Sequence, residues 1–314
     1  MNEHEENGVL SNQAEGFYHV PVLLNESIDA LNIDPSGTYV DCTFGGGGHA
    51  REILKRLNSE GKLYAFDQDE DAKANIPADS RLVFIPHNFR NLSRFLRLYG
   101  IGQVDGILAD LGVSSHQFDV PSRGFSIRFD APLDMRMDTS QEKTAADILK
   151  EMSADQLQYI FQEYGEISNS KTLALLLESK AKTNPIKTIN ELKAAVSSVV
   201  KGNPNRYFAQ LFQALRMTVN DEIAALIDML EQSAVLLKPG GRIAVITFHS
   251  IEDRVVKNYF KKGITDAASI DHIYGIKKIT PFMPLNKKPI EPGEKEIKNN
   301  PRSRSARLRV AVKN

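Results

Sequence analysis

A run of four glycines stands close to acidic residues that end predicted strands. The run, Asp41-Cys-Thr-Phe-Gly-Gly-Gly-Gly-His49, lies between a predicted strand and a predicted helix. Glycines there let the chain turn sharply and let a ligand approach the main chain closely. Asp67 ends the next predicted strand, where its carboxylate can accept hydrogen bonds from both hydroxyls of a ribose. The pattern predicts an adenosine-containing cofactor; the plainer interpretation is a tight turn with an aspartate at a strand end.

The glycine run alone does not select one cofactor. Gly45, Gly47 and Ala50 fit the spacing of a dinucleotide fingerprint, but no second nucleotide-binding half is recognisable after it. S-adenosylmethionine needs the same adenosine contacts and carries a sulfonium cation instead of a pyrophosphate. Asp41 and Asp110 end neighbouring predicted strands, so their carboxylates would stand near that cation. Charge therefore favours the methyl donor, and a nicotinamide-dependent dehydrogenase stays the first alternative.

The segment Asp110-Leu-Gly-Val-Ser-Ser-His-Gln117 leaves the fourth predicted strand at the sheet edge that holds active sites in open α/β folds. The exocyclic amine of cytosine or adenine has a lone pair that is delocalised into the ring. A carboxylate such as Asp110 can accept its N–H and direct the lone pair at a methyl group held in line. The (Asp/Asn/Ser)-Pro-Pro-(Tyr/Phe) signature of amino-methylating enzymes is absent, so such chemistry would run on a different loop. A structural turn is the plainer interpretation.

Short aliphatic runs predict the strands that position these residues. Five of them read as buried strands of a parallel sheet: 38–42, 62–67, 81–85, 104–110 and 242–248. A helix over 49–57 separates the first two, which implies right-handed crossovers and a doubly wound α/β sheet. Alternation of polar and apolar residues predicts a final strand over 305–312.

About 130 residues separate the fourth strand from the fifth, which is too long for a loop in a compact domain. Capping-box patterns at Ser153-x-x-Gln156 and Thr188-x-x-Glu191, with a break at Asn184-Pro185, predict that this interval is helical. We place an inserted helical domain at 125–205. A helix over about 206–237, ending at Lys238-Pro239-Gly240-Gly241, should return the chain to the sheet.

Composition excludes several classes of protein. The 39 Lys and Arg residues balance 40 Asp and Glu residues, which excludes a uniformly basic nucleic-acid coat but not a local basic surface. The single cysteine, Cys42, excludes an intramolecular disulfide and fits a reducing cytosol. No apolar run approaches the ~20 residues of a membrane-spanning helix. Residues 1–16 lack a signal peptide's basic start and apolar core and read as a disordered acidic tail. We expect a soluble, cytoplasmic protein.

Several motifs occur together and in a preserved order. They are YHVPVLL (18–24), DCTFGGGGH (41–49), DLGVSS (110–115), RGFS (123–126), PLDMRMD (132–138), LRMTVNDE (215–222), KPGGRIAVITFHSIEDR (238–254) and NPRSRSARLR (300–309). From about residue 18 to its end, the chain resembles the MraW/RsmH family, the 16S ribosomal RNA (cytosine-N4)-methyltransferases. This joint match is far more specific than the glycine run.

The resemblance implies a class I (Rossmann-like) methyltransferase domain, residues 17–124 and 206–314, with the helical insertion as a substrate-binding domain. It implies S-adenosylmethionine as donor, S-adenosylhomocysteine as product, and N4 of a cytosine in the decoding centre (P site) of 16S rRNA as acceptor. By motif position the family's cofactor contacts fall on Gly47, Gly48, His49, Asp67, Phe89, Asp110 and Gln117. Phe89 would pack on the adenine. Asp110 is the candidate catalytic residue, and no metal is expected.

Other residues allow a functional and a structural interpretation. His249-Ser-Ile-Glu-Asp-Arg254 would position the base, or would cap a helix through Ser250 with acidic residues in its first turn. Asp134 and Arg136 would line the cleft or form an internal ion pair that pins the insertion. The segment Arg206-Tyr207-Phe208 would stack an extruded base or pack at a domain junction. The C-terminal arginines would contact phosphates or face solvent: Arg302, Arg304, Arg307 and Arg309.

Two further classes stay open from the residues alone. One is a non-catalytic RNA-binding assembly factor, against which the intact Asp67 and Asp110 argue. The other is a methyltransferase for proteins or small molecules, since a fold does not fix a substrate. The sequence also leaves open the oligomeric state, a homodimer included, and the assembly stage of the RNA substrate.

Overall fold

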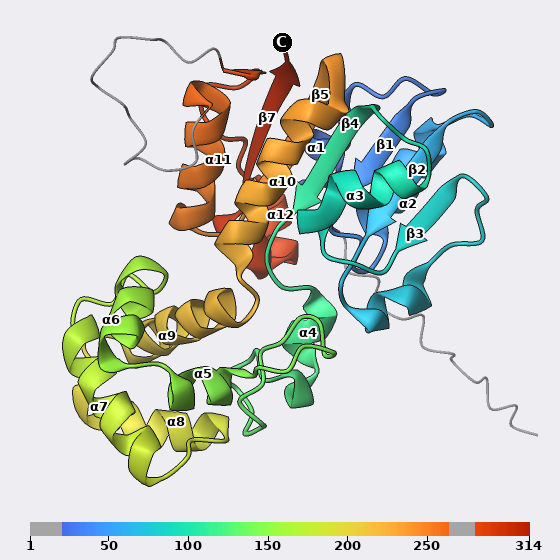
Figure 1. The fold of residues 1–314 in the computed structure, drawn as a ribbon. Coiled ribbons are helices and arrows are strands. Elements are labelled where there is room, and N and C mark those ends of the chain that lie inside the picture. Colours follow the sequence, from blue (N-terminus) through green and yellow to red (C-terminus); the bar gives the residue numbers. More distant parts are fainter. Residues whose placement is uncertain (1–20, 264–279) are drawn as a thin grey trace, which may run out of the picture.

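A seven-stranded sheet forms the body of the molecule (Figure 1). The computed structural model describes residues 21–263 and 280–314, so the predicted tail and the first residues of the 18–24 motif lie outside the described residues. The strand order is β3-β2-β1-β4-β5-β7-β6. The strands are β1 Thr38–Asp41, β2 Lys62–Phe66, β3 Leu82–Ile85, β4 Val104–Asp110, β5 Leu237–Thr247, β6 Phe282–Pro284 and β7 Arg307–Lys313. The five strands predicted as parallel pair in that sense, and β7 is antiparallel to β5 and β6, so the α/β prediction is confirmed.

Helices cover both faces of the sheet, which is why its central strands are apolar throughout. On one face pack α3 Leu92–Leu98, α10 Glu222–Leu236 and α11 Ser250–Lys262. On the other face pack α1 Leu24–Leu31 and α2 Gly48–Arg56. α12 Glu294–Asn299 precedes β7. The carboxyl ends of the parallel strands are left for loops that carry polar residues.

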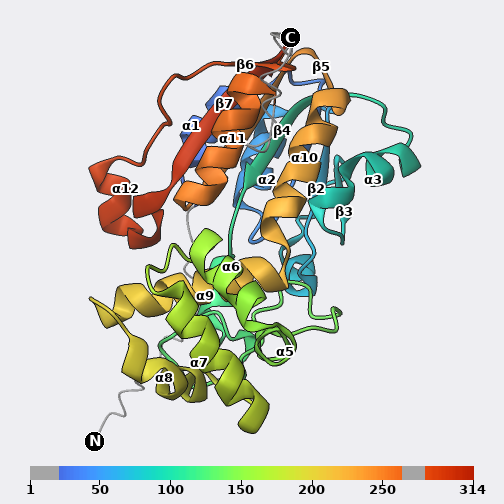
Figure 2. The ribbon, with the colours of Figure 1, turned by 60° about the vertical axis from the view of Figure 1, so that its left-hand side comes forward.

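A separate helical layer lies below the sheet in both views of the molecule (Figures 1 and 2). It consists of α5 Ala145–Glu151, α6 Ala154–Glu163, α7 Ser170–Thr183, α8 Ile189–Val196 and α9 Pro204–Val219. Their apolar residues form their own core, which includes Phe161, Leu177 and Leu215. Both predicted capping boxes are present, Ser153 with Gln156 and Thr188 with Glu191. The predicted helical character of this interval is therefore confirmed.

The chain returns to the sheet through two helices, so the single helix predicted over 206–237 is wrong. α9 ends at Val219, and α10 begins at Glu222 after Asp221 takes a left-handed conformation with φ +48°. Asn220 fixes this corner, because its side chain bonds to the main chain of Met135 and Met137. α9 packs in the helical core, which argues for a boundary near residue 220 instead of 205. The division into domains itself stays a prediction.

Two further details differ from the sequence prediction. α10 ends at Leu236 without a glycine cap, and residues 237–241 are already part of β5, opposite an irregularity in β4. β6 was not predicted, because three residues that include Pro284 carry no strand pattern. Among the described residues, no helix combines the length and the apolar character needed to cross a bilayer.

Candidate functional site

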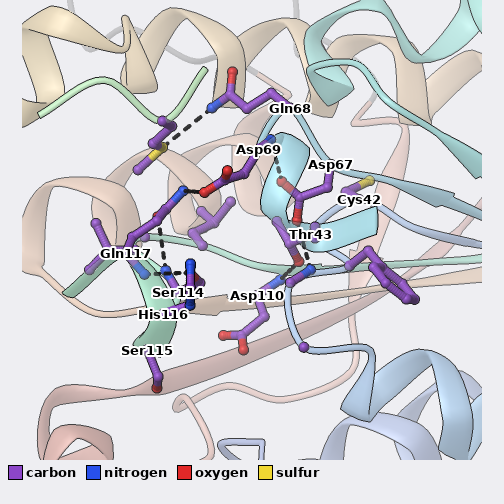
Figure 3. A pocket seen from close by; sticks show the side chains of 18 of the residues that line it. Cys42, Thr43, Asp67, Gln68, Asp69, Asp110, Ser114, Ser115, His116 and Gln117 are labelled. Carbon is purple, nitrogen blue, oxygen red and sulfur yellow. Dashed lines mark hydrogen bonds between the residues drawn. The ribbon is translucent and has the colours of Figure 1, made fainter. Parts of the chain in front are cut away.

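A cavity of about 850 Å³ opens at the carboxyl edge of the sheet (Figure 3). Its walls come from the loops after β1, β2, β3, β4 and β5, from α4 Ser115–Asp119, and from the α9–α10 corner. The volume is near the upper end of the range of ligand pockets in proteins. The cavity therefore joins the sheet to the helical layer, and most predicted site residues line it.

The glycine run wraps one end of the cavity. Gly47 has φ +73° and precedes the first turn of α2, which begins at Gly48. A Cβ on Gly48 would lie only 2.1 Å from Cγ of Pro21, so no larger residue fits there without a shift. Gly46 has open space on its Cβ side. Of the predicted cofactor contacts in this run, Gly48 and His49 line the cavity and Gly47 does not; Gly47 shapes the turn.

Asp67 lies at the end of β2 and is held by main-chain donors. Its Oδ2 accepts from Gly45 N at 2.7 Å and its Oδ1 from Asp69 N at 2.8 Å. Burial raises the pKa of Asp67 to about 6, although these hydrogen bonds oppose the shift. Each carboxylate oxygen can accept two hydrogen bonds, so each keeps capacity for a further donor from a ligand. Phe89 lines the cavity from the 3₁₀ helix after β3.

Asp41 and Asp110 end adjacent strands, as predicted, and Thr43 joins them. Thr43 Oγ1 accepts from Asp110 N at 2.7 Å, and Thr43 N donates to Asp41 Oδ1 at 3.0 Å. The other oxygens, Asp41 Oδ2 and Asp110 Oδ1, are buried without a hydrogen-bond partner among the described residues. Burial raises the pKa of Asp41 to about 7. Burial and then the Asp41 charge raise the pKa of Asp110 well above its usual range.

The nearest basic group does not neutralise these carboxylates. His49 Nδ1 lies 3.8 Å from Asp110 Oδ2, and His49 Nε2 lies 3.3 Å from the carbonyl oxygen of Val22. Burial lowers the pKa of His49 to about 4, so the imidazole is neutral near pH 7. Asp110 in the cavity wall and Asp41 on the adjacent strand are therefore without a basic partner, and a cationic ligand in the cavity would favour their ionised forms.

Gln117 lines the cavity, but its side-chain atoms are already engaged. Its Oε1 accepts from Ser114 N at 3.1 Å in a capping box, and its Nε2 donates to Asp69 Oδ2 at 2.7 Å. Arg123 also binds Asp69 and donates to the carbonyls of residues 136 and 137. Sequence reasoning missed this buried network, because its members are 48 and 54 residues apart and none stands in a recognisable pattern.

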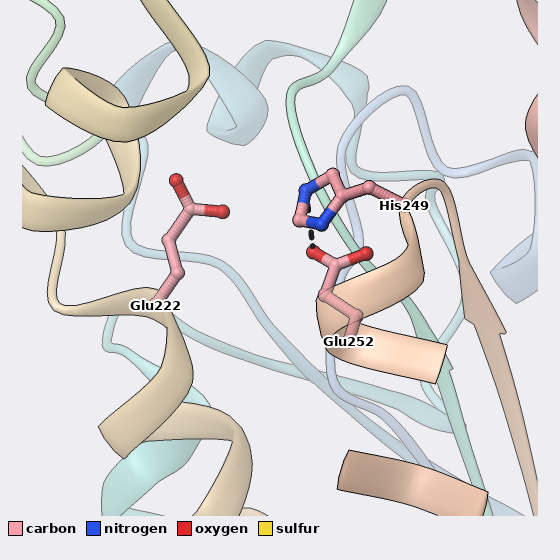
Figure 4. Close-up of side chains that lie close together, drawn as sticks. All are labelled: Glu222, His249 and Glu252. Carbon is pink, nitrogen blue, oxygen red and sulfur yellow. Dashed lines mark ion pairs between the residues drawn. The ribbon is translucent and has the colours of Figure 1, made fainter. Parts of the chain in front are cut away.

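A second polar cluster lies where the helical layer meets the sheet. Arg216 at the end of α9 donates to both oxygens of Glu222, at 2.8 and 3.0 Å. Glu222, His249 and Glu252 are residues of metal-ligand type with atoms within 4.8 Å of one another (Figure 4). Arg216 Nη2 lies 3.1 Å from His249 Nε2, so a guanidinium already supplies the cation of this cluster.

Comparison with known sequences decides what kind of protein has this cavity. The sequence profile of the MraW methylase family matches residues 16–314. The chain belongs to the MraW methylase family. It is a methyltransferase, as the motifs predicted. Its relatives include "Ribosomal RNA small subunit methyltransferase H" from Parabacteroides distasonis, 51% identical over 96% of this chain and 99% of that one.

A second relative of the methyltransferase, with the same name and from Cytophaga hutchinsonii, is 52% identical over 94% of this chain and 99% of its own. A solved structure of an rRNA methylase from Streptococcus thermophilus covers 94% of this chain and 98% of its own, with 12% identity and a TM-score of 0.40. That structural likeness is too distant to bear on function, so the family assignment rests on the sequence relatives.

The remaining predicted residues of the methyltransferase are mostly structural. Asp134 and Arg136 form a bidentate ion pair, at 2.8 and 2.7 Å, as the structural interpretation predicted. Tyr207 is buried in the helical core and donates to Asn169, which supports packing instead of base stacking. His249, not Ser250, precedes the first residue of α11, and no side chain caps the helix.

The four C-terminal arginines differ in surroundings. Arg309 is buried and bound to Asp253 at 2.6 and 2.9 Å, so its predicted phosphate contact is wrong. Arg307 reaches the same carboxylate at 3.4 Å and stays partly exposed. Arg302 lines the cavity and binds Asp119, whereas Arg304 is exposed. Of these four arginines, Arg302, Arg304 and Arg307 are accessible to RNA.

Proposed function

We propose that this methyltransferase modifies N4 of a cytosine in the decoding centre of 16S rRNA within the small ribosomal subunit. The name of the two relatives, ribosomal RNA small subunit methyltransferase H, supports the ribosomal substrate. The observation that carries the chemistry is the unpartnered carboxylate oxygen of Asp110, which lines the cavity, beside a second unpartnered oxygen, that of Asp41, on the adjacent strand. A ribosomal substrate also leads us to place the enzyme in the cytoplasm.

The methyl donor is S-adenosylmethionine, which supplies an electrophilic methyl group on a cationic sulfur. The residues present fit it: Asp67 keeps acceptor capacity for ribose hydroxyls, and the ring of Phe89 offers a face for adenine. Buried carboxylates favour a nearby cation and disfavour a pyrophosphate. Asp110 in the cavity wall and Asp41 on the adjacent strand therefore argue against the nicotinamide-dependent alternative.

Asp110 is the residue that we assign to the acceptor amine. Its unpartnered Oδ1 can accept one N–H of the N4 amine, which directs the lone pair away from the ring and toward the methyl group. A carboxylate with a raised pKa is also a stronger base than an exposed one. Asp110 is thus suited to take the amine proton as the new C–N bond forms. His49 lies 3.8 Å from Asp110, but burial keeps its imidazole neutral, so it does not form an ion pair with this carboxylate.

RNA binding is assigned to the helical layer and the accessible arginines around the cavity. Arg302 and Arg128 both lie near the ring of Phe118, at 4.9 and 5.4 Å from its centroid. Such cation–aromatic groups suit an unpaired strand, since bases stack on rings and phosphates pair with guanidinium groups. An unstacked target base can enter a cavity of this kind, as in other enzymes that act on bases.

Methyl transfer to small subunits that lack the modification tests the proposal. Labelled S-adenosylmethionine, followed by nucleoside analysis, should give N4-methylcytosine with the wild type. We expect Asp110→Asn to lose about 100-fold or more in rate when the cofactor is saturating, the range of a lost acid–base group. Asp105→Asn, on the same strand but outside the cavity, is the matched control.

The outcomes separate the alternatives. Label in a different nucleoside would overturn the cytosine assignment. Cofactor binding without any transfer would favour the assembly-factor alternative. Full activity of Asp110→Asn would keep the enzyme and remove the role of that carboxylate.

A further inference from the structure

Arg216 is an arginine on the wall of the methyltransferase cavity that the cofactor contacts do not use. It lies in the last turn of α9, so it reaches the cavity from the helical layer. Its side chain is 15% exposed. A guanidinium with so little water around it needs partners, and its partners decide which of its N–H groups remain for a ligand.

One edge of the guanidinium is fixed and the other is not. Nε and Nη2 donate to the two oxygens of Glu222, and Nη2 also lies 3.1 Å from His249 Nε2. Nη1 has no hydrogen-bond partner within residues 21–263 and 280–314. The bidentate pair therefore holds the guanidinium in one plane, while two N–H groups of Nη1 stay available.

Arg216 and Asp110 both line the cavity near the end of β5, because Asp110 pairs with Ile246 in the sheet and Arg216 contacts His249, three residues further along. Glu252 is 2% exposed, and its charge acts on both groups. It contributes, after burial and Asp41, to the raised pKa of Asp110. Burial lowers the pKa of Arg216, but Glu222 and then Glu252 outweigh burial and keep it cationic. The acceptor Asp110 and the fixed donor Arg216 thus both lie close enough to the buried Glu252 for its charge to act on them.

The corner that carries Arg216 is rigid. Asn220 donates to the carbonyl oxygens of Arg216 and Met135, at 2.9 and 2.8 Å, and accepts from Met137 N at 2.7 Å. Glu222 stands two residues further on, in the first turn of α10. The donor edge is therefore preorganised before any substrate binds, which is what a group that discriminates between bases requires.

We propose that Arg216 is a specificity-determining residue that donates from Nη1 to N3 and O2 of the target cytosine while Asp110 accepts from N4. This inference rests on the proposed function. Cytosine presents one donor, the N4 amine, beside two acceptors, N3 and O2. Uracil presents an N–H at position 3 and a carbonyl oxygen at position 4, so Nη1 would face a donor at position 3 and Asp110 would face an acceptor at position 4. Arginine suits the task because its planar fork fixes direction as well as charge.

Two anions are alternative ligands for the Nη1 edge, and the experiment must distinguish their binding from binding of the cytosine base. One is the carboxylate of the methionine part of the cofactor, and the other is an RNA phosphate. Loss of Arg216 would then weaken cofactor binding, or would weaken RNA binding regardless of the base. Only the base assignment makes the effect depend on the atom at position 3 of the ring.

The test uses full-length enzyme and small subunits reconstituted with 16S rRNA that carries cytosine or 3-deazacytosine at the methylated position. 3-Deazacytosine replaces N3 by C–H and keeps the amine. The variant is Arg216→Gln combined with Glu222→Gln, because a lone Arg216→Gln would leave a buried carboxylate unpaired. Arg81→Gln is the matched control: Arg81 forms the same bidentate pair, with Asp79, outside the cavity.

We expect the wild type and Arg81→Gln to prefer cytosine over 3-deazacytosine by at least about tenfold in kcat/KM, within the 5- to 150-fold expected of a base contact. The double variant should show a ratio near one, with unchanged affinity for S-adenosylhomocysteine. An unchanged ratio, or a loss of cofactor affinity, would overturn the proposal. Absence of N4-methylcytosine with the wild type would instead overturn the proposed function, and the inference with it.

Discussion

At the scale of single residues, the unusual feature is a group of buried carboxyl groups without counter-ions. Asp41 and Asp110 each keep one buried oxygen without a partner among the described residues, and Asp67 is held only by main-chain donors. Buried carboxylates usually pair with a cation, because an unpaired buried charge is costly. The missing positive charge is then best supplied by a ligand, and a sulfonium has the right sign.

Asp41 predicts how the apoprotein responds to pH. Its pKa rises from 3.8 to about 7 on burial, so the native state keeps a proton that the unfolded state has lost. The contribution of Asp41 to the free energy of unfolding therefore falls as pH rises from about 4 to about 7. A bound cation offsets this loss. We expect the preference for S-adenosylmethionine over uncharged-sulfur S-adenosylhomocysteine to increase about tenfold from about pH 6 to about pH 8.

Calorimetric titration of both ligands across that range measures the preference, with Asp41→Asn as the comparison. The variant should show a preference that changes little with pH. A wild-type preference that is flat across the range would mean that the carboxylates do not sense the sulfur charge.

Arg309 predicts a loss of stability instead of a loss of RNA affinity. Its guanidinium and Asp253 are both buried, and removal of Arg309 leaves Asp253 with only the longer contact to Arg307 at 3.4 Å, which costs about 3 kcal/mol. Urea unfolding of Arg309→Met should show a loss of this size, and adding Asp253→Leu should recover most of it. Arg304→Gln, at an exposed position, should change stability by less than about 0.5 kcal/mol. Weaker RNA binding of Arg309→Met at unchanged stability would contradict this assignment.

At the scale of elements, α4 connects the cavity to the C-terminal segment. Asp119 at its end accepts from Arg302 at 3.1 and 2.5 Å and from Arg128 at 3.2 Å. The Arg302 guanidinium also lies 4.9 Å from the ring centroid of Phe118. These residues lie near the cavity but are largely exposed. The contact is therefore weak and depends on salt.

Arg302→Gln should raise the dissociation rate of the cofactor by about three- to fivefold at low salt, since an exposed pair contributes up to about 1 kcal/mol. The difference from the wild type should vanish at about 1 M salt, where charges are screened within about 3 Å. Stopped-flow displacement of a fluorescent cofactor analogue measures both rates. Equal rates at low salt would mean that the segment does not retain the cofactor.

The elements that sequence predicted well have strong local signals. The strands are short apolar runs, and the two capping boxes need only neighbours three residues apart. The α9–α10 corner could not be predicted, because the left-handed Asp221 depends on Asn220 binding residues 83 and 85 positions away. The same holds at the site: motif position indicated Asp67 and Phe89, whereas the Asp69–Arg123 pair joins distant segments.

One missed residue did have a signal. Arg216 and Glu222 both lie in the LRMTVNDE motif, six positions apart. That spacing does not place two side chains on one helix face, so the pair is formed only because the chain turns between them. Predicting a helix break at Asn220 would have shown that the side chains of Arg216 and Glu222 can meet.

At the scale of the whole molecule, the sheet with its covering helices and the helical layer share one cavity. Arg123 crosses between them: it binds Asp69, next to the cofactor loop, and the carbonyls of residues 136 and 137 at the edge of the helical layer. Arg216 crosses at a second point, from α9 to Glu222. A structural change at the cofactor loop can therefore be transmitted to the helical layer through Arg123.

Cofactor binding should slow amide exchange in two places, the loop of residues 67–71 and the segment of residues 132–138. In Arg123→Lys, which keeps the charge but loses the planar fork, the first effect should remain and the second should weaken. Exchange measured by mass spectrometry with S-adenosylhomocysteine resolves the two segments. Undiminished protection of 132–138 in the variant would show that the coupling runs elsewhere.

The place of β7 in the sheet has a consequence for how the enzyme is made. The ribosome releases residues 307–313 after every other strand, yet β7 inserts between β5 and β6 and carries the arginine that neutralises Asp253. At about 5–20 residues per second, synthesis needs about 3–13 s to pass from the end of β5 to the end of β7. During that time the nascent chain has a gap where its last strand belongs. A ribosome that stalls before this point therefore yields an unfinished sheet, and the active methyltransferase forms only after β7 has been made.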